Sequence, residues 1–335
     1  MEQNLQSTCE LIADNAQVLR KKLRWETSPN NLAIMSAFIL AANGKKADLK
    51  AYNECKKILK DNAGILSEFR GLGQAMVITK MTQAKDPEAF LQGSMTIYKK
   101  LREIHKLTAS PFMVMAAITL YENGGLQQAD ENIDKLEALY KAEKAKHPLL
   151  IDDQDRGYLA MLVAFSMNAD NISDEIERCY EAAKKLSIDK NSVHSMAQVM
   201  SLSGKSSDEK VKFAQDMVKK LKAAKTPISK SYGLSAIGSL TLLDCDEDTL
   251  VSEIAEAEAY FRKQKPFKWY NCDKRLRCVY ATLAVLVSRT ADKEAVLATG
   301  ISSTLVMVLV EQLIMMSVIV AMNASNAARS SASSN

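Results

Sequence analysis

The chain has 335 residues, which is too long for one small core and indicates either two domains or one extended helical array. Hydrophobic residues make up 47% of it, so the chain can bury a core, which excludes a disordered polymer. A net charge of +4 on this length excludes a strongly basic, general nucleic-acid binder, and we expect no specific nucleic-acid partner.

Strong helix formers dominate the composition, whereas glycine (12) and proline (6) are scarce. A fold rich in β-hairpins or Gly-rich loops would need more turn residues. Apolar residues recur at helical spacing almost throughout, and no convincing alternation typical of strands occurs. The sequence therefore predicts an all-α fold of about fifteen helices.

Several helices have clear predicted starts. Pro29 lies near the first turn of one helix, and Asp86 and Ser110 are each followed by a proline suited to the first helical position. Residues 127–146 form a charged amphipathic helix that ends before Pro148. Further helices are predicted to start near Lys46, Asp152, Ser173, Asn191, Ser206, Ser229 and Asp246.

The predicted helices form pairs, about one pair per forty residues, joined by short loops. This favours a superhelical, α-solenoid-like arrangement, with a set of helical bundles as the alternative. We expect an N-terminal helical region over 1–150 and a C-terminal helical region over 151–290. An apolar C-terminal helix follows over 291–322, and a Ser/Ala/Asn-rich tail over 323–335 is predicted to be disordered.

The apolar C-terminal helix is long enough to cross a bilayer, which takes about 20 apolar residues. Between Ala295 and Met322 its only formal charge is Glu311, near the middle, where an ionised carboxylate in lipid would be costly. We favour a buried rod in the core or in an oligomer, because a helix that is apolar on all sides suits such a place. Membrane insertion is the alternative.

Residues 260–277 combine basic and aromatic side chains. Such residues could meet an anionic surface, with cations on phosphates and aromatics at a bilayer interface or on bases. The favoured interpretation is a loop whose aromatics anchor to the core while its lysines face water. The candidates for an anionic surface are Arg262, Lys263, Lys265, Lys268, Trp269, Tyr270, Lys274, Arg275 and Arg277.

One group of residues could hold a hard cation: His147 with Asp152, Asp153 and Asp155. The favoured interpretation of these acids is a helix start, where carboxylates cap free amides and complement the helix dipole. No pair of histidines has zinc-site spacing. The sequence therefore predicts no catalytic residue, no cofactor and no metal.

The six cysteines include no Cys-x-x-Cys pair, and the first residues show no basic segment followed by an apolar run. Both features favour free thiols in a reducing cytosol.

Several short motifs carry a family resemblance. They are Lys-Leu-Arg-Trp at 22–25, Phe-Arg-Gly at 69–71, His-Pro-Leu-Leu at 147–150 followed by Asp155, and the run 191–202. With them the chain resembles an uncharacterised family of Gram-positive bacteria known only as a domain of unknown function, number 4003 in that series. The resemblance implies a helical protein of the bacterial cytosol and no activity.

The first hypothesis for function is a non-enzymatic helical scaffold that binds a protein partner on a concave surface. The second is a membrane-associated protein that contacts the bilayer peripherally through residues 260–322. The third is an enzyme of unrecognised type that uses His147 and Asp155. Self-association into a homo-oligomer stays open.

Overall fold

The computed structural model describes residues 1–24, 26, 29–104, 110–152, 155–165 and 172–290, together with Leu305, Val308 and Leu309. Within these residues the chain forms fourteen α-helices and no strand. The all-α prediction is therefore confirmed. All six cysteines lie in the described part and are thiols, as the sequence predicts.

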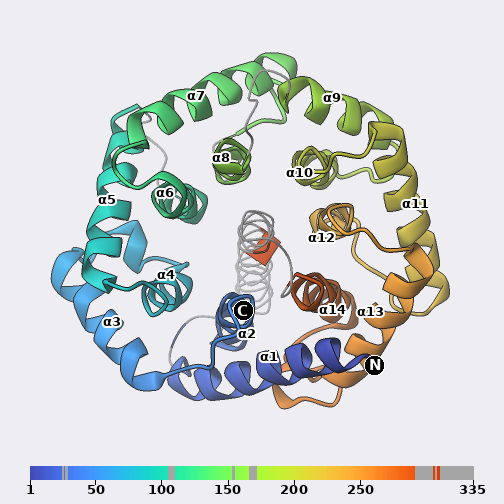
Figure 1. Cartoon of the computed structure of the whole chain (residues 1–335), viewed down its shortest axis with the longest axis horizontal. Coiled ribbons are helices and arrows are strands. Elements are labelled where there is room, and N and C mark those ends of the chain that lie inside the picture. Colours follow the sequence, from blue (N-terminus) through green and yellow to red (C-terminus); the bar gives the residue numbers. More distant parts are fainter. Residues whose placement is uncertain are drawn as a thin grey trace, which may run out of the picture.

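The helices form two concentric rings (Figure 1). The odd-numbered helices make the outer ring and lie roughly in its plane, and the even-numbered helices make the inner ring and are seen end-on. The outer helices are α1 (Gln3–Lys22), α3 (Leu49–Asn62), α5 (Pro87–Ile104), α7 (Ala129–Lys146), α9 (Ile172–Ala183), α11 (Ser207–Ala223) and α13 (Glu247–Phe261). The inner helices are α2 (Pro29–Ala41), α4 (Gln74–Met81), α6 (Pro111–Gly124), α8 (Asp155–Phe165), α10 (Lys190–Met200), α12 (Leu234–Leu240) and α14 (Lys274–Ser288). Two short 3₁₀ helices, η1 (Glu68–Arg70) and η3 (Lys265–Phe267), lie in the connections.

The helices are paired, as the sequence predicts, but the pairs close into a ring instead of an open superhelix or separate bundles. The predicted boundary near residue 150 falls between α7 and α8 within this ring, and the division into two regions stays a prediction.

Hydrophobicity explains which helices lie inside. Outer helix α3 buries one stripe, made by Tyr52, Cys55 and Leu59. Inner helix α2, in contrast, buries every residue from Asn31 to Ala41. An inner helix has neighbours on both sides and the outer ring behind it, so only a helix that is apolar nearly all round fits there.

Most predicted helix starts are confirmed by their caps. The side chain of Asp86 accepts hydrogen bonds from the amides of residues 88 and 89, and that of Ser110 accepts one from Met113. Ser206 forms a capping box with Glu209. Two predicted starts are wrong: α3 begins at Leu49 and α12 at Leu234, several residues after the predicted Lys46 and Ser229. The described part of α8 begins at Asp155, and the two residues that follow the predicted start at Asp152 lie outside the described residues.

Successive outer helices meet head to tail, and oppositely charged side chains pair where two helices meet. Lysines in the last turn or two of α5, α7 and α11 pair with acids in the first turn of the next outer helix. These pairs are Lys100–Asp130 at 2.5 Å, Lys146–Asp174 at 2.9 Å and Lys220–Glu247 at 2.8 Å. Each pair lies at the surface, where solvent screens it, and the charges complement the helix dipoles.

The ring is closed by contacts between the first and last hairpins. Phe38 of α2 stacks on Tyr280 of α14, with ring centroids 5.7 Å apart, and meets Phe261 of α13 edge-on at 6.4 Å. The side-chain amide of Asn30 donates to the carbonyl of Pro266 in η3 at 2.8 Å. Because these contacts join residues more than 200 positions apart, the closure is a property of the whole chain.

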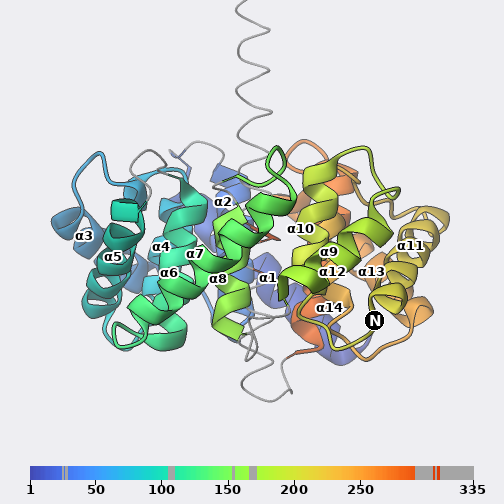
Figure 2. The same cartoon turned by 90° about the horizontal axis from the view of Figure 1, so that it is seen from above.

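The ring has two distinct faces. We call the face where the inner helices begin the N face and the face where they end the C face. In Figure 2 the α3–α4 connection stands at the upper edge, on the N face, and the α6–α7 connection at the lower edge, on the C face. Neighbouring connections bond along each face: Ser187 donates to the carbonyl of Lys230 on the N face, and Ser203 to that of Thr241 on the C face.

The described residues also reach the middle of the ring. Leu305, Val308 and Leu309 are helical, fully buried and part of the same core cluster as the inner helices. The short red segment that holds them lies within the inner ring in Figure 1. They belong to the predicted apolar helix 291–322, whose other residues, like the predicted tail 323–335, lie outside the described residues.

Candidate functional site

Large apolar side chains stand exposed on the N face. They come from the ends of outer helices and from the connections into α4, α6, α8, α10 and α14, one or two from each. We call them the N-face tips: Ile65, Leu66, Ile104, Leu149, Ile188, Trp269 and Tyr270. Other exposed apolar residues, such as Leu49 and Leu126, lie away from this face.

In these connections the exposed tips lie next to residues that are buried in the core or held by backbone hydrogen bonds. After Pro148 the chain turns back, with the amides of Leu150 and Ile151 donating to the carbonyl of His147. Ile151 is buried by this turn, whereas Leu149 is fully exposed at 102%. Ile188 (99% exposed) likewise lies directly before the N-cap residue of α10. Leu149 and Ile188 therefore project from a backbone that is held by neighbouring contacts.

The connection from α13 to α14 follows the same rule and tests the sequence prediction for 260–277. Phe267 anchors it to the core, stacked on Phe261 with centroids 4.4 Å apart. Trp269 and Tyr270 do not anchor: they are 81% and 57% exposed and contact each other edge-on. Of the aromatics in 260–277, Phe261 and Phe267 are buried in the core, whereas Trp269 and Tyr270 are exposed.

Most of the predicted basic candidates lie on this surface beside Trp269 and Tyr270. The exposed ones are Arg262, Lys263, Lys265, Lys274 and Arg275, and Lys268 is half-buried. Arg277 differs: it is 4% exposed, its Nε donates to Glu258 at 2.7 Å, and its Nη1 donates to the carbonyls of Phe267 and Cys272. Arg277 therefore holds the connection in place from below instead of facing an anionic partner.

The predicted metal group is only partly assembled. His147 pairs with Glu177 at 2.6 Å, Asp152 is exposed, and the backbone amide of Asp152 donates to Asp155. Asp153 lies outside the described residues. Within the described part of the chain no group of three or more His, Cys, Asp and Glu side chains is placed to hold a metal ion.

Instead, the structure gathers a buried polar cluster around His194 of α10. Its Nε2 lies 3.2 Å from Glu143 of α7, and its Nδ1 lies 3.5 Å from Asp155 of α8. Burial by itself would lower the pKa of His194, but the contacts with Asp155 and Glu143 outweigh it and raise that pKa to about 9. The histidine is then a cation at neutral pH, which suits an ion triad better than a general base.

The surroundings of the triad are hydrogen-bonded as well. Ser173 donates to the second oxygen of Glu143 at 2.5 Å, and Gln198 donates to Asp155 at 2.9 Å. The ring of Tyr180, on outer helix α9, packs edge-on against the imidazole ring of His194, and the two ring centroids are 5.7 Å apart. The triad therefore ties α7, α8 and α10 together and is a structural element of this sector of the ring.

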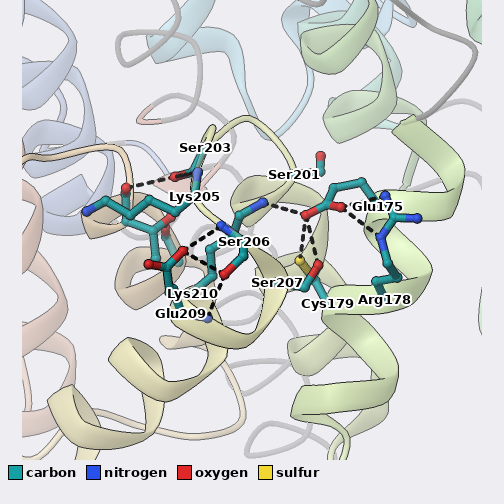
Figure 3. A network of polar contacts seen from close by, with 12 residues as sticks. Glu175, Arg178, Cys179, Ser201, Ser203, Lys205, Ser206, Ser207, Glu209 and Lys210 are labelled. Atoms are coloured by element: carbon teal, nitrogen blue, oxygen red, sulfur yellow. Dashed lines mark hydrogen bonds and ion pairs between the residues drawn. The ribbon is translucent and has the colours of Figure 1, made fainter.

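A second polar network joins α9 to the start of α11 (Figure 3). Glu175 accepts from Lys210 at 2.5 Å, from Ser207 at 3.1 Å and from Arg178 at 2.7 Å. Burial raises the pKa of Glu175, but the hydrogen bonds from Lys210 and Arg178 outweigh this effect and bring the pKa to about 2. With its carboxylate satisfied by several donors, Glu175 clamps two helices and offers no open binding position.

Sequence reasoning missed most of the N-face tips. The sequence marks them only weakly, because each is one or two apolar residues inside a polar connection. Ile65 and Leu66, between Gly64 and Ser67, are an example. Isolated surface hydrophobics are normal, and only the fold shows that these gather on one face. Among the described residues, no helix is long and apolar enough to span a bilayer.

A family model described as "Protein of unknown function (DUF4003)" matches residues 15–318, nearly the whole chain. No curated protein and no solved structure matches the chain. The family resemblance predicted from short motifs is thus confirmed, and its bacterial origin stays a prediction.

Proposed function

The chain belongs to this family, whose description assigns no activity, and we propose that it is a non-enzymatic helical scaffold that docks with its N face on an anionic membrane surface. The observation that carries the proposal is the gathering of the exposed N-face tips on one face, with basic residues beside them. Anionic lipids at the cytoplasmic side of a membrane would fit the cytosolic location that the sequence predicts.

The arrangement of the tips favours a bilayer over a protein. A stable protein interface buries contiguous, complementary surface, on the order of 800 Å² per partner, with an apolar centre. The N-face tips come from separate connections around a ring, one or two from each. A lipid surface accepts separate tips, because its headgroup region adapts to each one.

Magnitudes support the same choice. Complete burial of one large apolar side chain contributes about 1.5–3 kcal/mol, and partial insertion contributes less. Each basic residue near an anionic surface adds about 1 kcal/mol. The seven tips and the exposed cations beside Trp269 can each contribute in this way, and their sum acts against a cost of association on the order of 4–15 kcal/mol.

A protein partner held in a concave groove, the first hypothesis from the sequence, has less support. In a closed ring the concave surface is the inner one, and Leu305, Val308 and Leu309 are packed against it. We therefore assign the binding role to the N face and keep a protein partner there as the alternative outcome of the test.

The test is cosedimentation of the full chain with vesicles of phosphatidylcholine alone or with about 30% phosphatidylserine. We expect binding to the anionic vesicles that weakens with salt. Replacing three tips together (Leu66→Ser, Leu149→Ser, Ile188→Ser) should weaken it at least about tenfold, because a loss of about 1.4 kcal/mol suffices. The matched control is Leu49→Ser with Leu126→Ser, which removes exposed leucines away from the N face.

Full-length variants are preferable to a truncation, because removal of Leu305, Val308 and Leu309 would open the core. Equal binding by the wild type, the tip variant and the control would overturn the proposal and assign any membrane contact to another segment. Absence of vesicle binding by the wild type would also overturn it, and a protein partner on the N face would then be the function to pursue.

A further inference from the structure

A basic pocket lies at the seam where the ring closes. It has a volume of about 360 Å³ and opens between the end of α1, the start of α2 and η3. This volume is within the range of small-molecule sites, roughly 300–1,000 Å³. Its lining consists of Gln17, Arg20, Lys21, Arg24, Pro29, Lys265 and Pro266.

The lining is positive and contains no carboxylate. Four of its seven residues are cations, contributed by α1, by the residues that follow it and by η3. Within the described residues, Arg20, Lys21 and Lys265 form no ion pair. The like charges of these three side chains repel one another, and an anion between them would relieve the repulsion.

The helix ends at the pocket contribute little by comparison. The C-terminus of α1 carries about half a negative charge, and the N-terminus of α2, marked by Pro29, carries about half a positive charge. The two nearly cancel. The four whole charges on the side chains therefore decide the sign of the potential in the pocket.

The pocket is built on a fixed frame. Pro266 is buried in its wall, and the carbonyl of Pro266 accepts a hydrogen bond from Asn30 at 2.8 Å, which ties η3 to the first turn of α2. Phe267, the next residue, is stacked in the core. Arg20 is half-buried on a regular helix. Such preorganisation lowers the ordering cost of binding a ligand.

We propose that this pocket binds a ligand that carries two or more phosphate groups. Arginine forms paired hydrogen bonds with phosphate oxygens, and lysine adds a point charge. A phosphate monoester carries about −1.5 to −2 charges at neutral pH, so two such groups offset the three lining cations that form no ion pair within the described residues, Arg20, Lys21 and Lys265. Gln17 can donate or accept one further hydrogen bond to the rest of the ligand.

The ligand can be a soluble phosphorylated metabolite or the phosphorylated headgroup of a lipid. None of the N-face tips lines the pocket, but Lys265 belongs both to the pocket and to the exposed cations near Trp269. Binding of pyrophosphate in solution needs no membrane, so it tests the pocket separately from the docking role proposed above.

The experiment uses isothermal titration calorimetry of the full chain with pyrophosphate, and with inorganic phosphate as the weaker probe. We expect saturable binding of pyrophosphate, at least about tenfold tighter than that of inorganic phosphate, because a second phosphate adds further charge-assisted hydrogen bonds. Arg20→Gln combined with Lys265→Gln should weaken pyrophosphate binding at least about tenfold. The control, Lys212→Gln combined with Lys222→Gln on α11, removes the same charge from exposed positions elsewhere.

Equal binding by the wild type, the pocket variant and the control would show a general charge effect and overturn the proposal. Absence of saturable binding by the wild type would also overturn it. Vesicles that carry a bisphosphorylated inositol lipid distinguish the two sources. Binding to them that pyrophosphate displaces and the pocket variant lacks assigns the site to a lipid headgroup, whereas pyrophosphate binding without vesicle binding assigns it to a soluble ligand.

Discussion

The ion triad of His194, Glu143 and Asp155 gives the protein a pH-dependent stability whose sign can be derived. The pKa of His194 in the folded chain is raised to about 9, from an ordinary value near 6.5. A raised pKa means that the folded state binds the proton more tightly than the unfolded state. The resulting stability is fully present below pH 6.5 and is lost as the pH rises through 9.

The magnitude follows from the shift. A difference of about 2.5 units corresponds to about 3 kcal/mol at 1.36 kcal/mol per unit, and about 2 kcal/mol of it is lost between pH 6 and pH 8.5. His194→Gln removes the titrating group and should flatten the pH dependence over that range. The assay is urea denaturation of the full chain, followed by far-ultraviolet circular dichroism, at several pH values.

The control is Gln198→Leu, which removes a hydrogen bond to Asp155 without removing a titrating side chain. It should lower the denaturation midpoint by a similar amount at every pH. The reasoning is refuted if the wild type and His194→Gln give parallel midpoint curves between pH 6 and pH 8.5. Parallel curves would mean that His194 is not held as a cation between the two carboxylates.

Three further predictions concern the packing of the ring. The low pKa of Glu175 adds stability that is present above about pH 4.5 and lost as the pH falls towards 2. Glu175→Gln should cost about 1–2 kcal/mol at pH 7, because it leaves the buried Lys210 without its partner charge while solvent screens part of the loss, and it should flatten the acid limb of a denaturation profile. Gly93→Ala should destabilise the chain by about 1–3 kcal/mol, since the new Cβ would lie 2.0 Å from the ring of Tyr121, whereas Gly204→Ala, with nothing within 4 Å, should leave the melting temperature nearly unchanged. Leu309→Ala should cost about 2–5 kcal/mol in urea denaturation, and an unchanged midpoint would contradict burial of this residue in the core.

Local signals in the sequence predict the helices well. Asp86, Ser110 and Ser206 act as N-caps because their short polar side chains reach the free amides of the next turn, an effect that needs no tertiary contact. The wrong start at Ser229 has the same origin. Ser229 is a good capping residue, but the chain extends farther before α12 begins at Leu234.

Ring closure, in contrast, could not be read from local signals. It depends on Phe38, Phe261 and Tyr280, each of which reads as an ordinary apolar residue of an amphipathic or buried helix. The interhelical angles that bring the last hairpin back to the first follow from packing at every step around the ring. A small change in each step would give an open superhelix, so the same pattern of helices allows both architectures.

The candidate sites show the same limit. Residues 260–277 were singled out from composition, and their exposed cations and Trp269 lie on the surface as that interpretation requires. Arg277 carries the same charge in the sequence but is buried, because its position in the first turn of α14 places it over Glu258. Charge alone cannot separate a surface cation from a buried structural one, since burial is set by partners that are distant in the chain.

The connections on the N face include longer ones than those on the C face. This difference in length supports the choice of the N face as the binding surface. Connections on the N face include 63–73, 224–233 and 262–273, whereas those on the C face include the shorter 82–86 and 125–128. A longer connection than the turn requires costs ordering entropy, and helical hairpins can be joined by few residues. Binding residues concentrate on loops held by a rigid scaffold. The longer N-face connections carry Ile65, Leu66, Trp269 and one wall of the basic pocket, and a binding role gives that extra length a physical reason.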